Sequence, residues 1–249
     1  GTPSLYNGPM DTIIHIAPHG YVRHVDTLGT DLSVVNAARA SYMKESREFS
    51  EGDEKLIKYL ALHGHTSPFR HAAMTFEIKA PLMVARQWFK YRVGSAHSEP
   101  GEEDSSDSLY ARNEASRRYV TLPPQFYVPF EWRSAPASSK AGSGGPAPAR
   151  ESARQEALLT SHIVRSVLLY EEALDAGICA EQARLFLPAY ALYTTWRWTG
   201  SLHAIAHFLN QRLSDDAQHE IQDYARVVHS LVKRAFPKSI GWLVVESGL

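Results

Sequence analysis

The spacing of hydrophobic residues in the first part of the chain predicts two helices. A short strand and then a helix are expected over residues 11–41, where apolar residues recur at helical intervals after Asp31, a suitable N-cap. A second helix is expected over about 53–63. We expect Gly64 to end it, because glycine readily adopts the left-handed conformation found after many helices.

Alternation replaces the helical period over residues 73–79, where every second residue is apolar. That period is typical of a strand with one buried face. Pro81 then suits the first turn of a further helix, which we expect to reach about Phe89.

Two irregular segments interrupt the pattern further along the chain. Residues 96–111 are rich in serine and acidic residues, and residues 134–149 are of low complexity, so both are expected to be exposed loops. The helices expected in the rest of the chain are a long amphipathic one over Glu151–Ala176 and shorter ones near 180–187, 199–211 and 215–235. Helices around a small sheet indicate an α+β fold, and we expect residues 1–249 to form a single domain.

Composition narrows the class of protein. Lys and Arg total 26 and Asp and Glu total 27, so the formal charge is −1, which argues against a dedicated nucleic-acid-binding protein. No apolar run approaches the ~20 residues of a transmembrane helix, and the first residues lack the pattern of a signal peptide. We therefore expect a cytoplasmic protein with neither a membrane nor a nucleic acid as partner.

The single cysteine, Cys179, excludes an internal disulfide and fits a reducing compartment. We expect it to be a small buried hydrophobic residue rather than a reactive thiolate. The sequence also contains no glycine-rich phosphate loop and no nucleophile elbow. These absences disfavour P-loop and dinucleotide-fold enzymes and hydrolases of the nucleophile-elbow type.

Arginine is concentrated in segments 86–92 and 112–119, on either side of the acidic residues of 96–111. Guanidinium groups bind phosphates and carboxylates through paired hydrogen bonds, so these segments suit a nucleotide or an acidic cofactor. Without 96–111, the stretch from Arg86 to Arg118 holds six basic residues against one acidic residue. A solvated surface with salt bridges is the alternative, and composition alone favours it.

Three histidines, His63, His65 and His71, follow the second predicted helix. No carboxylate or thiolate stands at a helical spacing from them, so we expect no metal site. A turn that offers imidazoles and hydroxyls to an anion is the milder interpretation.

A later helix carries Ser201, His203, His207 and Asn210 along one side and apolar residues along the other. These polar groups could face a ligand. The alternative is an amphipathic helix with ordinary polar residues on its outer face, and this alternative would be preferred if the segment stood alone.

Residues 87–92 are Gln-Trp-Phe-Lys-Tyr-Arg, and residues 113–119 are Asn-Glu-Ala-Ser-Arg-Arg-Tyr. These segments resemble the two halves of the signature of the flavin-dependent thymidylate synthase family, Gln-x-x-Arg-His-Arg and Asn-Glu-x-Ser-x-Arg-Tyr. The likeness extends over most of the chain in an ordered series of segments, among them 63–69, 183–188 and 200–220. This series outweighs the surface interpretations given above.

Two features depart from the family pattern. Lys90 and Tyr91 stand where the family has Arg-His, so one guanidinium and one imidazole are replaced. Arg92 and Ser116 are 24 positions apart instead of the family's 8, an insertion of 16 residues that corresponds to 96–111. Both changes lie where the family's flavin and nucleotide meet, so they bear on the choice of nucleotide more than on the reaction class.

The resemblance implies a site at a subunit interface of a homotetramer, with FAD as cofactor and NADPH and methylenetetrahydrofolate as co-substrates. The positions that match flavin contacts are Ser41, Ser67, Lys90, Tyr91, Arg92, Glu114, Ser201, His203 and His207. The positions that match nucleotide contacts are Gln87, Trp88, Phe89, Lys90, Glu114, Ala115, Ser116, Arg117, Arg118, Arg184 and Arg212. Arg212 matches the catalytic residue that favours ionisation at nitrogen 3 of the uracil ring.

The reaction so implied is reductive methylation of carbon 5 of a uridine monophosphate, with dUMP the family's usual substrate. The changed motif motivates a second hypothesis, a methylase that prefers UMP in a modified-nucleoside pathway, because a rebuilt loop beside the sugar could admit the 2′-hydroxyl. A third hypothesis is a homologue that binds nucleotide or flavin without catalysis, motivated by the loss of the Arg-His pair.

Overall fold

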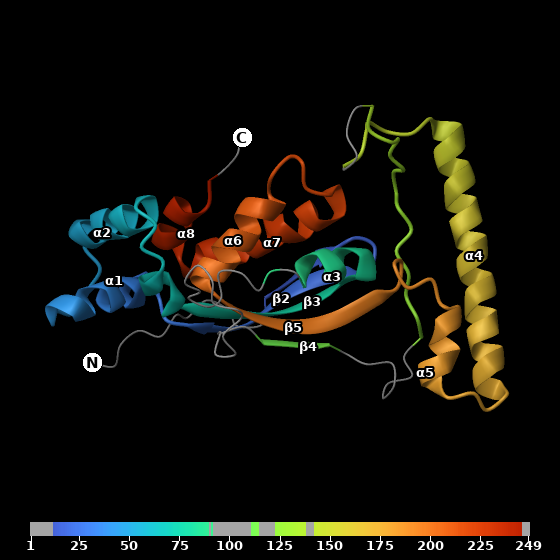
Figure 1. Cartoon of the computed structure of the whole chain (residues 1–249), viewed down its shortest axis with the longest axis horizontal. Helices are drawn as coiled ribbons and strands as arrows, with labels where there is room; N and C mark the ends of the chain where they lie inside the picture. Colours follow the sequence, from blue (N-terminus) through green and yellow to red (C-terminus); the bar gives the residue numbers. More distant parts are fainter. Residues whose placement is uncertain (1–11, 90, 92–110, 115–122, 138–141, 246–249) are drawn as a thin grey trace, which may run out of the picture.

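The computed structural model contains a five-stranded antiparallel sheet covered by helices, with a helical arm at one end (Figure 1). It describes residues 12–89, 91, 111–114, 123–137 and 142–245. The strand order is β1-β2-β3-β5-β4. The expected α+β fold, with helices around a small sheet, is confirmed.

The sheet is centred on the strand that the alternating pattern predicts. The strands are β1 (Ile13–Ile16), β2 (Gly20–Leu28), β3 (Ala73–Pro81), β4 (Ala111–Glu114) and β5 (Tyr193–Ser201). On β3, the side chains of Met74, Phe76 and Ile78 are at most 1% exposed, whereas the residues between them are half-buried. The predicted period-two strand is therefore confirmed.

The sheet differs from the sequence-based prediction in three places, one of which is β4, where no strand is predicted. The sequence predicts one short strand before the first helix, but β1 and β2 form an antiparallel pair there. The sequence also predicts a helix from about residue 199, where β5 still pairs with β3 as far as Ser201. Pairing along the whole of β3 and burial of Trp196 and Trp198, each 1% exposed, fix this segment as a strand.

The helices before and after β3 lie close to their predicted positions. They are α1 (Asp31–Arg39), α2 (Glu51–Leu62) and α3 (Leu82–Trp88). Gly64, at φ +70°, follows the end of α2 as predicted. The N-cap of α1 is Thr30 rather than Asp31, which is the first helical residue.

The core lies between the sheet and a layer formed by α3, α6 (Leu202–Arg212) and α7 (His219–Ala235) (Figure 1). At its centre the Trp88 ring stacks on Phe208 at 4.4 Å and meets Trp198 edge-on at 5.4 Å. A short helix that the sequence pattern does not predict, α8 (Pro237–Leu243), packs against α2. These contacts fix α6, which carries most of the candidate site, rigidly on the sheet.

The arm is formed by α4 (Ala149–Asp175) and α5 (Ala180–Ala183), which lie beside each other away from α6 (Figure 1). The long helix is confirmed in its place, and its apolar stripe packs through Tyr170 on Ala183 and Leu187. Cys179 is exposed at the N-cap of α5, so the expectation that it is buried is wrong. It stands in the short connection between α4 and α5. No helix in the described part of the chain is long and apolar enough to cross a membrane.

Of the two predicted loops, the structure describes only the last residue of the first and parts of the second. Residues 96–110 lie outside the described residues, and Ala111 begins β4. The described parts of 134–149 are irregular as far as Pro148, and backbone hydrogen bonds join Ser134 to Gly144 and Gly145 at 2.8 and 2.9 Å. The low-complexity segment is therefore a loop whose two ends are paired.

Candidate active site

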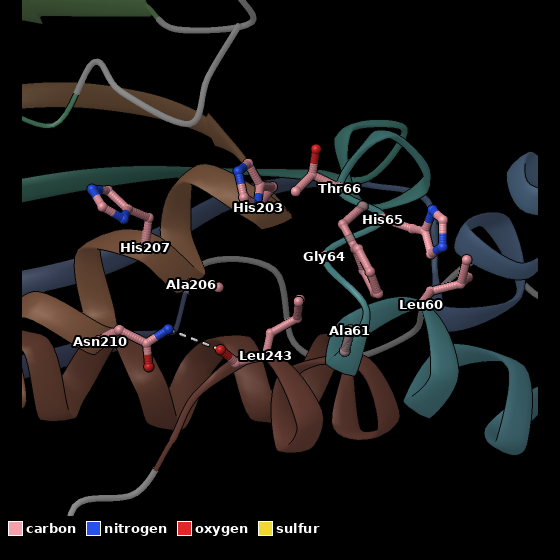
Figure 2. Close-up of a pocket in the computed structure, with 11 residues that line it drawn as sticks. Leu60, Ala61, Gly64, His65, Thr66, His203, Ala206, His207, Asn210 and Leu243 are labelled. Atoms are coloured by element: carbon pink, nitrogen blue, oxygen red, sulfur yellow. Dashed lines mark hydrogen bonds between the residues drawn. The ribbon is translucent and has the colours of Figure 1, made fainter. Parts of the chain in front are cut away.

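A cleft of about 200 Å³ lies between α6, α8 and the segment that follows α2 (Figure 2). Polar and apolar side chains share its walls, as is usual for small-molecule sites. The lining residues are Leu60, Ala61, Gly64, His65, Thr66, Phe69, His203, Ala206, His207, Asn210 and Leu243. The turn after α2 and one side of α6, two segments singled out from the sequence, thus face each other across one cavity.

The start of α6 is fixed by Ser201, whose hydroxyl accepts a hydrogen bond from the backbone N–H of Ala204 at 3.1 Å. Ser201 is fully buried and does not line the cleft. His203 and His207, one turn apart, do line it, and Figure 2 shows both rings projecting from the same side of the helix. The structure therefore brings the two histidines to the cleft and gives the serine hydroxyl a capping role.

Burial lowers the pKa of His203, and the nearby positive charge of Arg70 and the neighbouring His207 lower it further. Since the ordinary histidine pKa is about 6.5, His203 is neutral at pH 7. A neutral imidazole in the wall of the cleft can both donate and accept a hydrogen bond.

Asn210 lines the cleft and binds the backbone at the end of α8 and in the segment that follows it. Its amide donates to the carbonyl of Leu243 at 2.9 Å (Figure 2). Its side-chain oxygen accepts from the backbone N–H of Val245, also at 2.9 Å. These bonds hold the chain after α8 against α6. Asn210 thus has a structural function at the cleft.

Tyr91 and Arg212 lie together beside His207. The Arg212 guanidinium stands over the Tyr91 ring, with its central carbon 5.0 Å from the ring centroid. The Tyr91 ring also lies 5.8 Å from the His207 ring and 5.3 Å, edge-on, from that of Phe208. Two residues that the resemblance places at the flavin and the nucleotide are therefore in contact within one chain.

Arg212 combines a positive charge with a buried donor that has no acceptor among the described residues, its Nε. An unsatisfied buried donor is costly in a folded protein unless a ligand supplies the acceptor. Arg70, on the 3-10 turn η2 (Ser67–Arg70), has an Nε in the same condition. Arg70 was not singled out from the sequence, where it appears only as an isolated charge after Phe69.

The remaining flavin-matching positions are only partly brought together. Ser67 is exposed on η2, next to the cleft-lining Thr66, whereas Ser41 is exposed on the turn η1 (Ala40–Tyr42) and does not line the cleft. Glu114, at the end of β4, accepts a hydrogen bond from the Thr194 hydroxyl at 2.8 Å. These three positions are therefore accessible, but not on the walls of one cavity.

The nucleotide-matching positions are spread over several parts of the molecule. Trp88 is 1% exposed and Phe89 packs on the core, so their side chains support the fold rather than present a binding surface. Gln87 hydrogen-bonds Gln218 at the start of α7. Arg184 lies on η3 (Arg184–Phe186), directly after α5, and α5 lies in the arm away from α6, which ends at Arg212 (Figure 1). The predicted site residues outside the described part of the chain are Lys90, Arg92, Ala115, Ser116, Arg117 and Arg118.

Among the lining residues, His65 and Thr66 were expected only as part of a turn that could bind an anion, and Leu243 was not expected at a site. The first two belong to the turn after Gly64, and its density of histidines and hydroxyls was the available signal. Leu243 reaches the cleft only because α8 folds back on α2, which no local pattern indicates.

Comparison with known proteins gives consistent relatives over nearly the whole chain. The family described as "Thymidylate synthase complementing protein" matches residues 24–238. A flavin-dependent thymidylate synthase of Thermus thermophilus is 37% identical over 242 residues, which cover 97% of this chain and 80% of that protein. One of Thermosipho africanus is 38% identical over 224 residues, 89% of this chain and 90% of that protein.

Solved structures agree with these relatives. The UMP/dUMP methylase PolB from Streptomyces cacaoi, bound with 5-Br dUMP, has a TM-score of 0.75 at 28% identity and covers 92% of this chain and 96% of its own. The same enzyme bound with 5-Br UMP has a TM-score of 0.72 at 26% identity, over 90% and 92% of the two chains. The resemblance in the sequence motifs is thus supported by an independent likeness of fold. This chain belongs to the thymidylate synthase complementing protein family, which is that of the flavin-dependent thymidylate synthases.

Proposed function

We propose that this chain methylates carbon 5 of a uridine monophosphate, with methylenetetrahydrofolate as one-carbon donor, NADPH as reductant and FAD as redox carrier. The observation that carries the proposal is the pairing of Tyr91 with Arg212 beside the histidine-lined cleft. Tyr91 belongs to the segment that resembles the family's signature, and Arg212 matches the family's catalytic arginine. The names of the relatives, flavin-dependent thymidylate synthase and UMP/dUMP methylase, support the same reaction.

Arg212 is the residue we assign to activation of the uracil ring. Its guanidinium stays protonated at any relevant pH, so it stabilises negative charge that develops on the ring at nitrogen 3. Its buried Nε–H without an acceptor among the described residues supports this role, since a ligand oxygen or nitrogen can complete that hydrogen bond. The charge stabilisation makes carbon 5 more nucleophilic toward the one-carbon unit.

The flavin would be held by the cleft side of α6 and by the turn after α2. His203, His207 and Thr66 offer hydrogen-bonding groups there, and Phe69 and Ala206 offer apolar surface, a mixture that fits a heteroaromatic ring with polar edges. When bound, the flavin supplies the hydride chemistry that these side chains cannot. The protein's own part is to position the ring, exclude water and keep His203 neutral.

The size of the cleft supports a site that more than one subunit completes. Its volume of about 200 Å³ is below the ~300–1,000 Å³ usual for a site that encloses a drug-sized ligand. Arg184 directly follows α5, which lies in the arm away from α6, whose last residue is Arg212 (Figure 1), and this separation favours a nucleotide site to which Arg184 is contributed by another copy. The arm also exposes apolar side chains of Leu158, Val164, Leu168 and Leu185, each more than half exposed.

We therefore infer a homotetramer with sites between subunits. Light scattering of the purified chain should give about four times its mass of 27.8 kDa. A monomer that turns over substrate at full rate would contradict the inferred shared site.

Two nucleotides are candidate substrates, dUMP and UMP, and the methylase PolB, which is named for both, favours testing both. The decisive experiment compares turnover of the two with the same folate donor and NADPH, on protein whose flavin absorbance is recorded in the same sample. We expect yellow protein that methylates dUMP, UMP or both. Exclusive use of dUMP would exclude the UMP-preferring variant of the proposal.

The same sample also tests the alternative of a non-catalytic homologue. Colourless protein that takes up no FAD, or yellow protein that oxidises NADPH but methylates neither nucleotide, would contradict the proposed reaction.

A further inference from the structure

Three side chains of α6 pack against the ring of Tyr91, a residue that follows α3 in the chain. His207, Phe208 and Arg212 occupy adjacent turns of α6, and each lies within about 6 Å of the Tyr91 ring. Tyr91 itself is held by a turn after α3, in which its backbone N–H donates to the Trp88 carbonyl at 3.0 Å. The ring is 8% exposed, so its position is set by packing on both sides.

The contact with Arg212 differs from the other two in its chemistry. A guanidinium above the face of an aromatic ring is attracted by the negative potential of that face, and the attraction strengthens as water is excluded. The contact uses none of the N–H donors of the guanidinium as hydrogen bonds to the ring face. Arg212 is therefore restrained in orientation, while its buried Nε–H, which has no acceptor among the described residues, is available for a ligand.

The Tyr91 hydroxyl also interacts with Arg212. Burial, the larger effect, raises the pKa of Tyr91, whereas the charge of Arg212 and a side-chain hydrogen bond with it act to lower that pKa, so the phenol is neutral at physiological pH. A histidine at this position can carry a positive charge, and an imidazolium would repel the guanidinium. The tyrosine thus provides a flat, uncharged surface for Arg212.

We propose that Tyr91 is a positioning residue for Arg212: its ring fixes the guanidinium in the orientation that receives the nucleotide. The identity of the nucleotide rests on the proposed function, but the ring–guanidinium restraint does not. We assign the role to the ring, and Tyr91→Phe, which keeps the ring and removes the hydroxyl that also bonds Arg212, tests this assignment. A phenylalanine should preserve it, and a leucine of comparable apolar character should not.

The first test needs neither nucleotide nor activity. Phenylglyoxal modifies accessible arginines, and peptide mapping by mass spectrometry follows each one separately. On the FAD-loaded enzyme we expect Arg212 to react slowly in the wild type and in Tyr91→Phe, and severalfold faster in Tyr91→Leu. Arg226, whose side chain is 60% exposed on α7, is the internal reference and should react equally in all three proteins.

The second test measures the dissociation constant of dUMP, and separately of UMP, for the FAD-loaded enzyme by calorimetry. Loss of a ring–guanidinium contact corresponds to roughly a 2- to 30-fold weakening, expected for Tyr91→Leu and absent for Tyr91→Phe. In an Arg212→Lys background, Tyr91→Leu should weaken binding by clearly less than it does in the wild type, because both changes act on one group.

Each outcome decides the proposal. Equal Arg212 reactivity in wild type and Tyr91→Leu, or an undiminished effect of Tyr91→Leu in the Arg212→Lys background, would overturn it. If Tyr91→Phe behaves like Tyr91→Leu, the hydroxyl acts and the ring restraint is wrong. If Tyr91→Leu fails to fold, the comparison of wild type with Tyr91→Phe and Tyr91→Trp replaces it, and both variants must retain slow labelling. If the wild type binds neither nucleotide, the proposed function fails while the labelling result still decides the role of Tyr91.

Discussion

Asp31 and Ser239 are joined by two hydrogen bonds although 208 positions separate them in the chain. The Asp31 carboxylate accepts from the backbone N–H of Ser239 at 2.9 Å and from its hydroxyl at 2.6 Å. Its other oxygen accepts from the backbone N–H of Lys238 at 2.9 Å. The first residue of α1 therefore caps the N-terminus of α8 and satisfies donors that this short helix leaves free.

The Asp31→Ala variant should lose stability, because it leaves two backbone N–H groups and a hydroxyl without their acceptor. We expect a loss of about 2–4 kcal/mol in the free energy of unfolding, and about 1 kcal/mol for Ser239→Ala, which removes the hydroxyl alone. Urea denaturation followed by circular dichroism measures both. Asp223→Ala is the matched control: this carboxylate is 60% exposed in a pair with Arg226, so its loss should cost less than about 0.5 kcal/mol. A loss for Asp31→Ala no larger than the control's would contradict the capping role.

Gly20 should not tolerate a side chain, because Tyr224 occupies the space beside it. A Cβ atom added at Gly20 would lie 2.0 Å from the Tyr224 hydroxyl oxygen, which donates to the Lys79 carbonyl at 3.0 Å. We expect Gly20→Ala to break that hydrogen bond and to lower the free energy of unfolding by about 1–3 kcal/mol.

The control for this change is Gly241→Ala in α8, where an added Cβ meets nothing within 4 Å. It should stabilise the protein by about 0.5–1 kcal/mol, because alanine favours the helix and restricts the unfolded chain. Thermal unfolding of both variants gives the comparison. Equal shifts in the two melting temperatures would mean that the glycine at β2 is not sterically required.

His203 should make stability depend on pH in a defined direction. Its folded pKa lies below the unfolded value of about 6.5, chiefly because of burial and then because of Arg70 and His207. Its contribution is fully present above pH 6.5 and is lost as the pH falls through the folded pKa, because protonation places a charge in the cleft beside Arg70. The difference in unfolding free energy between wild type and His203→Asn should therefore shrink as the pH is lowered from 7.5 to 5. Parallel pH curves for the two proteins would show that the pKa of His203 is the same folded and unfolded.

Arg212→Ala should abolish methylation while the protein folds and retains FAD. Loss of one charged group that stabilises developing negative charge lowers kcat by about 10²–10³-fold. Gln211→Ala is the control, because Gln211 is the exposed neighbour on the same turn of α6, and its kcat should be unchanged. Stopped turnover assays and flavin absorbance on each purified variant give the result. A kcat within twofold of wild type for Arg212→Ala would remove Arg212 from catalysis.

The sequence predicted the fold best where a local pattern coincides with burial. Over 73–79 the alternation of apolar residues matches β3, because this strand buries one face against the helices. The long helix starting near residue 150 is found in its place for the same reason. β5 was not predicted, because its Thr and Arg residues interrupt the apolar pattern and Gly200 and Ser201 run directly into the helical period of α6. The local signal for that strand was the alternation of the apolar Trp196 and Trp198 with the polar Arg197.

The candidate site shows the same division. The sequence placed His203 and His207 on one helix, which the structure confirms, and the structure extends that helix to Arg212. The sequence did not show that His203 and His207 line the cleft, whereas Ser201 is a buried N-cap and Trp88 is a core residue. Accessibility of a side chain depends on what packs over it, and the packing partners of Trp88 come from β5, α6 and α7.

By itself the sequence determined the family, the α+β class, and the concentration of arginines and histidines in a few short segments, because motifs and periodicity are local properties. Only the tertiary structure decided that the turn after α2 faces α6 across a cleft, that Asp31 caps α8, and that Tyr91 lies under Arg212. Each of these depends on contacts between segments far apart in the chain, and such contacts are set by the packing of helices on a sheet whose strand order no local pattern specifies.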